Sequence, residues 1–506
     1  MLTGRTLVFA TVPAGRVVTW STSPVGTFTL LATLLGLGFA IAVPQLGGAD
    51  EPVHFLRAWQ VSGGDWINER TGSVELCGGG TDRGPTVVGT FPADLLDDTR
   101  EIYARGLLDA SRTGLGPGGA ADAWRTIDDP APGGPACNLG ISTGAVYSPI
   151  PYAGSAIGVG LARIVGLSTF AALLLARLGA LIAYVLVVRR AVRRAGSAAW
   201  VVAVLGLAPV AVAQSAMITA DSLTIALALL AVVLARHAAD PETPLDRHLL
   251  IEIAIVAAAL GLAKPPYVLL LVMFVPVVLR RRAAGGVALA AVLVPAAILF
   301  AAWSGYAQSI YVPLENPYDP TAVTNDGYAY HDVDPDAQLR FVRAHPLDFV
   351  AAMGRTVARD GVEIPRDAVA QLPWRPFASA GAVAVVLLVG AALVLVVAPD
   401  RRRRARSPGG VARSDAFVTW GVVVATTGAV FLLAYTGWNA VGAPRIDEFQ
   451  GRYLFPVVGL AALASTHRST DVGSVPSTRS ATTGLAIATV SALAAFAALR
   501  IGLYWY

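Results

Sequence analysis

Long apolar runs alternate with short polar segments along most of the chain. An apolar run of about 20 residues can cross the hydrocarbon core of a bilayer as a helix. Arginine clusters lie at every second junction between these runs, and such clusters favour the cytoplasmic side. Single crossings are therefore expected at 26–43, 168–188, 198–214, 222–234, 287–303, 380–397, 418–435, 453–464 and 484–499. This alternation places the segments 44–167 and 305–375 outside the membrane as two large outer loops.

One apolar run, 249–279, is too long for an ordinary single crossing and has basic residues at both ends. The stretch AKPPY at 263–267 interrupts it, because two prolines cannot continue a helix without loss of hydrogen bonds. The sequence thus predicts a short broken hairpin with both ends cytoplasmic, which brings the total to about eleven crossings. Each leg of about 15 residues rises only about 22 Å. Lys264 is therefore expected to lie below the outer surface.

The predicted fold class is an all-α polytopic membrane protein with a long extracytoplasmic first loop. We expect a cytoplasmic N-terminal segment at 1–25, a transmembrane module at 26–466, a cytoplasmic loop at 467–482 and a final transmembrane helix at 483–506. An alternative concerns the first run alone, because AIA at 40–42 is similar to the cleavage site of a signal peptide.

Composition agrees with a membrane protein. Hydrophobic residues make up 55% of the chain and charged residues only 14%, which excludes an ordinary soluble domain. The net charge of +4 does not indicate a nucleic-acid partner, because the basic residues gather at the ends of apolar runs. A single lysine, with abundant alanine, glycine and proline, suggests a bacterial genome rich in G and C, and hence the bacterial plasma membrane.

The two cysteines, Cys77 and Cys137, both fall in the first outer loop. One pair in one polar segment fits a disulfide in an oxidising compartment. Two unpaired thiols are the alternative.

The first cluster of candidate chemistry is PQLGGADEPVHFLRAWQ at 44–60, directly after the first apolar run. A carboxylate at the mouth of a membrane cavity is well placed to take a proton from a hydroxyl group. Asp50 and Glu51 are the catalytic candidates, and His54 and Arg57 lie on the same helix face as Asp50. The alternative is that Asp50 or Glu51 only caps a helix that begins near Pro52.

Two cations mark further clusters at the outer ends of the crossings. Lys264 stands beside Tyr267, and it either extends its charge to the interface or binds an anionic lipid headgroup. Arg452 lies in DEFQGRYLFP at 447–456, close to Gln450. An arginine at an outer helix start needs a local partner, which is either Glu448 or a phosphate.

Other polar positions have simpler explanations. The stretch HDVDPDAQLRF at 331–341 departs from a calcium-binding loop, so we expect it to cap a helix near Pro335, and no metal ligand is assigned. Asp221 is expected to cap the crossing at 222–234. Residues 338–357 are expected to form helices on the outer membrane surface, divided by Pro346.

Five motifs, in order, resemble the landmarks of a bacterial family of predicted membrane proteins, domain-of-unknown-function family 2142. They are GGADEPVHFLRAWQVSGG, VYSPIPY, LAKPPY, HPLDF and QGRYLFPV, and they span roughly 44–456. That family is grouped with the GT-C glycosyltransferases, multi-pass enzymes that use polyprenyl-phosphate sugars outside the membrane. The resemblance implies that Asp50, with Glu51 beside it, deprotonates the acceptor or helps to bind a divalent metal. It also places Tyr152, which ends YSPIPY, near the active site.

The sequence therefore predicts a GT-C-like enzyme that transfers a sugar from a polyprenyl phosphate to a glycan or lipid of the cell envelope, on the outer side. Membrane lipids and these substrates are the expected partners. The alternative is a transporter or flippase of a lipid-linked envelope precursor. The residues expected to bind substrate are His54, Arg57, Tyr152, Lys264, Tyr267, Gln450 and Arg452. Of these, Lys264 and Arg452 would hold the donor phosphate.

Overall fold

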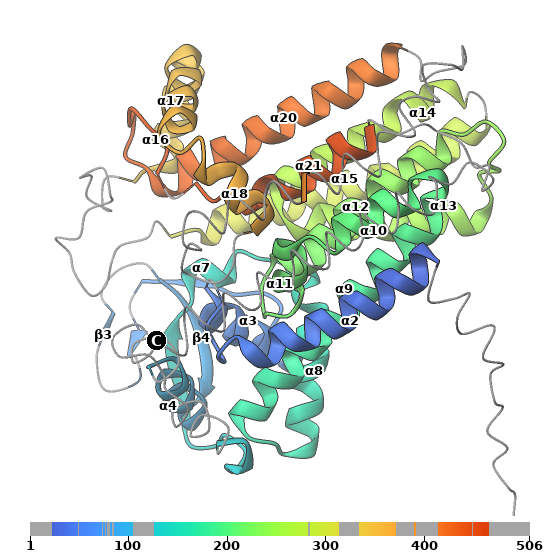
Figure 1. Ribbon diagram of the computed structural model, residues 1–506. Helices are drawn as coiled ribbons and strands as arrows, with labels where there is room; N and C mark the ends of the chain where they lie inside the picture. The colour runs from blue at the N-terminus through green and yellow to red at the C-terminus, as the bar shows by residue number, and fades with distance from the viewer. Residues whose placement is uncertain are drawn as a thin grey trace, which may run out of the picture.

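The computed structural model describes residues 23–48, 50–72, 74–75, 77, 81–82, 86–104, 126–281, 284–312, 333–370, 389–390, 413–447 and 449–464. Most of the described chain is helical, and the long helices run in a common direction (Figure 1). The helices of this bundle are α2 (Pro24–Ala42), α9 (Thr169–Arg194), η4 (Gly196–Ala198), α10 (Ala199–Gly206), α11 (Pro209–Ser215), α12 (Asp221–Ala238), α13 (Arg247–Ala263), η5 (Pro265–Phe274), α14 (Val275–Arg280), α15 (Ala284–Ile310), α20 (Arg413–Trp438), η7 (Gly451–Leu454) and α21 (Phe455–Ala464).

Five of the described helices are long and apolar enough to cross a membrane: α2, α9, α12, α15 and α20. A sixth span results if α10 and α11, which meet at a bend of 70°, are counted as one. Each of the six matches a crossing expected from the sequence. The total of about eleven is not confirmed, because α13, η5 with α14, and η7 with α21 are shorter, and the runs at 380–397 and 484–499 lie almost wholly outside the described residues.

The break predicted at AKPPY is present. Helix α13 ends at Ala263, and Lys264 adopts an extended backbone with φ −141° and ψ 131°. A residue before proline is pushed out of the helical region by the proline ring, so Pro265 imposes this break. The chain then continues as the 3₁₀-helix η5, which packs against α13. The apolar run thus folds back on itself with Lys264 at the turn.

The first loop gathers at one end of the bundle, which we call the loop end (Figure 1). Its elements are α3 (Glu51–Gly63), β1 (Arg70–Thr71), β2 (Val74–Glu75), β3 (Thr81–Asp82), β4 (Thr86–Pro92), α4 (Ala93–Tyr103), η2 (Thr126–Asp128), β5 (Ala136–Gly140), α7 (Ser142–Ala145), η3 (Ile150–Tyr152) and α8 (Ala153–Val165). The strand β4 pairs antiparallel with β1 and β5, and β2 pairs with β3. The loop therefore departs from the all-α expectation by two small sheets.

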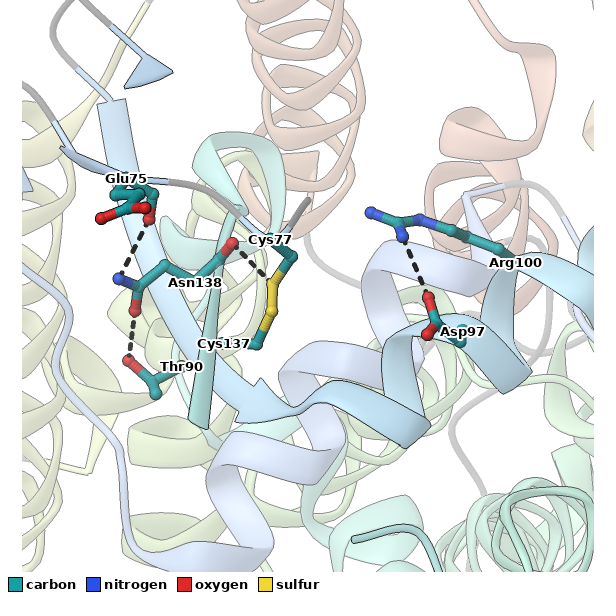
Figure 2. Close-up of a disulfide and its surroundings, with 7 residues drawn as sticks. All are labelled: Glu75, Cys77, Thr90, Asp97, Arg100, Cys137 and Asn138. Carbon is teal, nitrogen blue, oxygen red and sulfur yellow. Dashed lines mark hydrogen bonds and ion pairs between the residues drawn. A yellow bond between two sulfur atoms is a disulfide. The ribbon is translucent and has the colours of Figure 1, made fainter. Parts of the chain in front are cut away.

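A disulfide between Cys77 and Cys137 ties the sheet region together (Figure 2). Next to it, the side chain of Asn138 links two other segments of the loop. Its amide nitrogen donates to the Glu75 carbonyl at 3.3 Å, and its oxygen accepts from the Thr90 hydroxyl at 3.0 Å (Figure 2). The disulfide and Asn138 thus both fasten the segment around β2 to the β4–β5 pair.

Helices α8 and α9 join the first loop to the bundle through glycine contacts. A Cβ atom on Gly158 would lie 2.0 Å from the Leu175 carbonyl oxygen, and one on Gly179 would lie 2.1 Å from the Gly154 carbonyl oxygen. Only glycine permits such backbone approach, as in the small-residue interfaces of membrane helices. The start of α9 is thereby held against the helix that leads out of the first loop.

The second large loop, between α15 and α20, contains the described helices α16 (Pro335–Ala344), α17 (Pro346–Arg359) and α18 (Glu363–Ala370). Helix α16 packs on α20, and α18 packs on α11 and η7 (Figure 1). The predicted division at Pro346 is confirmed. So is the predicted cap near Pro335, because the Asp334 carboxylate accepts from the Ala337 N–H at 2.9 Å. Helix α18 packs so tightly on η7 that a Cβ on Gly451 would lie 2.2 Å from the Ile364 carbonyl oxygen. The second loop thus packs directly on the segment that carries Arg452.

The disulfide gives a prediction about the side of the membrane on which the first loop lies. If the loop is extracytoplasmic, a membrane-impermeant thiol reagent added to intact cells should label Cys77 and Cys137 only after reduction, because oxidised thiols do not react. Mass spectrometry of the labelled peptides measures this. Ready labelling of both thiols without a reductant would contradict the disulfide. Labelling after reduction that occurs only in lysed cells would contradict the outer location.

Candidate functional site

Arg177, in the middle of α9, fixes the loop end of α2. Its Nη1 donates to the carbonyl oxygens of Ala40 at 2.9 Å and Val43 at 2.6 Å, and its Nη2 donates to that of Pro44 at 2.6 Å. The Arg177 guanidinium also donates to both carboxylate oxygens of Glu51, at 2.8 and 2.7 Å. Both side chains are fully buried, so the pair is a two-pronged ion pair inside the protein.

Glu51 is held entirely by protein groups. Besides Arg177, its carboxylate accepts from the backbone N–H groups of Gly48 at 2.9 Å and Ile218 at 3.0 Å. These four hydrogen bonds tie together α2, α3, α9 and the segment before α12. A carboxylate in this position cannot receive a proton from a substrate without loss of its partners. The geometry therefore favours a structural role for Glu51 over the catalytic role expected from the sequence.

Asp50 differs from Glu51 in both its exposure and its hydrogen bonding. It occupies the position before α3 in a left-handed backbone conformation, with φ 58° and ψ 14°, and its side chain is exposed. Non-glycine residues rarely adopt this conformation, although aspartate tolerates it better than most. Neither Asp50 nor Glu51 caps α3, since Asp50 makes no capping hydrogen bond and Glu51 bonds elsewhere. The capping alternative is therefore wrong. The exposed Asp50 carboxylate makes no hydrogen bond with the residues that the structure describes, and we call its position the rim of the site.

His54, one turn along α3, is buried between two tyrosines. Its Nδ1 lies 2.7 Å from the Tyr152 hydroxyl, and its ring contacts those of Tyr147 and Tyr152 edge-on or tilted. Burial lowers the pKa of His54 from 6.5 to about 4, although the Asp50 carboxylate acts in the opposite direction. His54 is therefore neutral at physiological pH, and Tyr152 and His54 form one hydrogen-bonded unit.

Arg57 is also buried, but it faces the first loop. Its Nε and Nη2 donate to the Tyr147 carbonyl at 3.3 and 3.2 Å, and Nη2 also donates to the Trp66 carbonyl at 2.7 Å. Its Nη1 donates to the Gln60 side chain at 3.3 Å and the Asp65 carbonyl at 3.1 Å. These bonds use all five guanidinium N–H groups. The geometry does not support Arg57 as a substrate ligand, because no donor remains.

Lys264 and Arg452, which are 188 residues apart, meet on one carboxylate. Lys264 Nζ contacts Oδ1 of Asp221, and Arg452 Nε donates to Oδ2 of Asp221 at 3.1 Å. Asp221 does not cap α12 as expected, because Ala220 precedes the helix and Asp221 is its first residue. Lys264 is only 7% exposed, so it does not extend to the interface. Glu448, the other partner considered for Arg452, lies outside the described residues.

Tyrosine rings surround the two cations. Lys264 Nζ lies 4.2 Å from the centre of the Tyr453 ring and 5.9 Å from that of Tyr147, and Arg452 Cζ lies 5.1 Å from the Tyr453 ring. The Tyr267 hydroxyl donates to the Tyr453 carbonyl at 2.7 Å. Burial raises the pKa of Tyr147 to about 12, so its hydroxyl stays protonated. We call Asp221, Lys264, Arg452, Tyr147, Tyr267 and Tyr453 the inner cluster.

The inner cluster and the rim belong to one site. His54, one turn along α3 from Asp50, has its ring centre 5.7 Å from that of Tyr147, and the Tyr147 ring centre lies 5.9 Å from Lys264 Nζ. Gln450, at the start of η7, has a buried Oε1 without a hydrogen-bond partner among the described residues. Tyr453 and the pairing of Asp221 were not predicted from the sequence, and Tyr147 was predicted only as the first residue of YSPIPY. The pairing of Asp221 could have been inferred from its place in an otherwise apolar stretch, since a buried charge needs a partner there.

The arrangement can hold an anion and remove a proton. Lys264 and Arg452 contribute two positive charges and Asp221 one negative charge, so the inner cluster has a net charge of +1. Among the described residues no group of three or more His, Cys, Asp or Glu side chains is arranged to hold a metal ion. The chemistry that the described residues offer is thus that of a buried anion site beside a free carboxylate.

The fold and the site are those of a mostly helical membrane protein with several apolar helices and a polar site at one end of the bundle. The chain belongs to the family of predicted membrane proteins designated DUF2142, whose model matches residues 33–461. This match includes every site residue from Asp50 to Arg452. Neither a curated protein sequence nor a solved structure matches the chain.

The Arg177–Glu51 pair should control stability. We expect Glu51→Gln and Arg177→Met each to lower the free energy of unfolding by about 3–5 kcal/mol, because each leaves a buried partner uncompensated. Unfolding of purified protein in detergent, followed by tryptophan fluorescence, measures the loss. Arg100→Gln is the matched control, since it breaks an exposed pair with Asp97 and should cost at most about 1 kcal/mol. Glu51→Gln protein of normal stability would refute the structural role.

His54 should make stability depend on pH. Between about pH 6.5 and 4 the unfolded chain binds a proton at His54 while the folded protein does not, so stability should fall as the pH is lowered through this window. Above pH 6.5 this contribution disappears. The slope from His54 should approach about 1.4 kcal/mol per pH unit. His54→Gln, which keeps a hydrogen-bond acceptor, should flatten the curve of melting temperature against pH, and an unchanged curve would contradict the assignment.

Proposed function

We propose that this protein is a membrane glycosyltransferase that moves a sugar from a polyprenyl-phosphate donor to a glycan or lipid acceptor of the bacterial cell envelope. One observation supports this most directly: two buried cations share one buried acid, and one of them, Arg452, is acted on by the charge of an exposed carboxylate that has no hydrogen-bond partner among the described side chains. A lipid-linked phosphodiester and a hydroxyl acceptor are substrates that need these two features together.

Lys264 and Arg452 are the proposed ligands of the donor phosphate. The ammonium group is a compact point charge, and the planar guanidinium matches two phosphate oxygens. Both lie at the loop end of an apolar bundle, so a polyprenyl chain could remain in the bilayer while its phosphate reaches them. Gln450 and Tyr267, which flank the cations, would contact the same headgroup. This arrangement favours a lipid-linked donor over a soluble sugar nucleotide.

Asp50 is the proposed general base. It would take the proton of an acceptor hydroxyl as the hydroxyl oxygen bonds to the anomeric carbon of the sugar. The bond between that carbon and the phosphate oxygen breaks, and its electron pair remains on the phosphate. Lys264 and Arg452 would stabilise this developing charge. His54 and Tyr152, which line the site behind Asp50, would position the substrate.

The site is proposed to face outside the plasma membrane. Basic residues gather at the opposite end of the bundle, where Arg190 and Arg194 of α9 both pair with Glu252 of α13 at 2.6 Å. Such clusters favour the cytoplasm. With that end inside, the loop end and the disulfide lie outside, where polyprenyl-phosphate sugars are used without nucleotide.

Asp50→Asn should reduce sugar transfer by about 100-fold or more, the usual contribution of a general base. The melting temperature should stay close to that of the unaltered protein, because the Asp50 side chain makes no capping hydrogen bond. The assay incubates purified protein with a panel of polyprenyl-phosphate sugars and envelope extracts and measures released polyprenyl phosphate.

Asp50→Glu is the matched variant, since it keeps the carboxylate and should retain part of the activity. Full activity of Asp50→Asn would remove Asp50 as the base. Movement of the lipid-linked sugar across the bilayer of reconstituted vesicles, without release of polyprenyl phosphate, would favour a transporter instead.

A further inference from the structure

The inner cluster has an unusual charge balance for buried groups. The side chains of Arg452, Asp221 and Lys264 are only 5%, 7% and 8% exposed. Their charges sum to +1. The Asp50 carboxylate also acts on Arg452, but it is exposed to solvent and its charge is screened, so it offsets this buried charge only in part. The cluster is therefore best balanced when it binds one further negative charge.

Hydrogen-bond donors also remain for such a ligand. In the part of the chain that the structure describes, Asp221 is the one hydrogen-bond partner of the Lys264 ammonium group, which has three donors. Arg452 uses Nε on Asp221 and Nη2 on the Tyr453 hydroxyl, at 3.4 Å, and its Nη1 makes no hydrogen bond there. The cluster is thus unsaturated beside Asp221.

We propose that Asp221 is a specificity-determining residue, whose carboxylate makes the site favour a singly charged phosphodiester over a doubly charged phosphomonoester. The inference rests on the proposed function, in which the donor is a phosphodiester. With Asp221 in place, a monoanion brings the cluster to neutrality, whereas a dianion leaves one negative charge in excess. Asp221 would therefore select the donor by charge.

The same charge balance would drive release of the product. When the acceptor oxygen bonds to the anomeric carbon, the sugar leaves the phosphate, and the acceptor proton goes to Asp50. The electron pair of the broken bond stays on the phosphate, so the bound phosphate changes from a monoanion to a dianion. Repulsion by the Asp221 carboxylate then weakens the binding of polyprenyl phosphate. Asp221, which lowers the net charge of the inner cluster before the donor binds, thus also favours release of the product.

The groups that face Asp221 do not obscure this effect near neutral pH. They are Lys264, Arg452, His54, Tyr147, Tyr152 and Tyr267. His54, with a pKa of about 4, and Tyr147, with a pKa of about 12, both stay neutral between pH 5 and 8. A phosphomonoester loses its second proton near about pH 6. Over this range, the ligand therefore changes charge and these two side chains do not.

The test compares two probes that carry no sugar: a short-chain polyprenyl monophosphate and its methyl diester. At about pH 8, where the monoester is a dianion, the purified full-length protein should bind the diester more tightly. Asp221→Asn should shift the ratio of the two dissociation constants by about tenfold or more toward the monoester, the equivalent of one favourable charge contact. At about pH 5, where the monoester is singly charged, the unaltered protein should lose most of its preference.

Asp97→Asn is the matched control, because it removes one acid from an exposed position and should leave the ratio unchanged. If Asp221→Asn does not fold, the pH dependence of the two dissociation constants in the unaltered protein tests the proposal instead. Equal or tighter binding of the dianion by the unaltered protein at about pH 8, or a folded Asp221→Asn protein with an unchanged ratio, would overturn the proposal. Binding of neither probe would overturn the proposed donor site as well. The expected selectivity without any sugar transfer would support the charge selection and count only against the proposed reaction.

Discussion

The buried ion pair between Arg177 and Glu51 is the constraint on which the loop end of the bundle depends. Helix α2 ends at Ala42, and its last carbonyl groups have no partners inside the helix. The Ala40 carbonyl would ordinarily accept from the N–H of residue 44, but Pro44 has none. Arg177 supplies that donor and also donates to the carbonyls of Val43 and Pro44. Glu51 neutralises the positive charge that is thereby buried. Arg177 therefore satisfies the carbonyl groups at the end of α2, and its partner Glu51 is the first residue of α3.

The same electrostatic requirement separates structural from candidate functional groups elsewhere in the protein. The Arg177–Glu51 pair is neutral, and its hydrogen bonds are complete. Arg57 has no acid partner among the described residues, but all five of its donors are used. The inner cluster alone among these buried sites combines a net charge with unused donors. Where protein groups already use every donor and acceptor, a ligand can form no further hydrogen bond. The inner cluster, which has unused donors, is therefore the strongest candidate for a ligand-binding site.

Local sequence signals predicted the features that depend on neighbouring residues. The apolar runs match the six candidate spans, AKPPY breaks its run at Lys264, and Asp334 caps α16 before the division at Pro346. The meeting of Lys264 and Arg452 was also predicted, but their shared partner Asp221 was not. The pair between Arg177 and Glu51 could not be predicted, because the two residues lie 126 positions apart and neither segment carries a signal that points to the other. The strands of the first loop were missed for a related reason. They are short, and their pairing across many residues leaves no alternating pattern to detect.

Asp50 is exposed and Glu51 is buried although the two acids are adjacent. The difference follows from the backbone between Gly48 and the start of α3. A Cβ on Gly48 would lie 2.9 Å from the Met217 sulfur and 3.1 Å from the Glu51 carboxylate, so the absence of a side chain there admits Glu51 to the interior. Glu51 is then drawn inward by Arg177, and the left-handed conformation of Asp50 turns the chain into α3 while its own side chain stays exposed. This conformation is unfavourable for a non-glycine residue and persists only where the surrounding structure enforces it. The buried acid thus positions the exposed one, and a change at Glu51 would displace the proposed base without touching its chemistry.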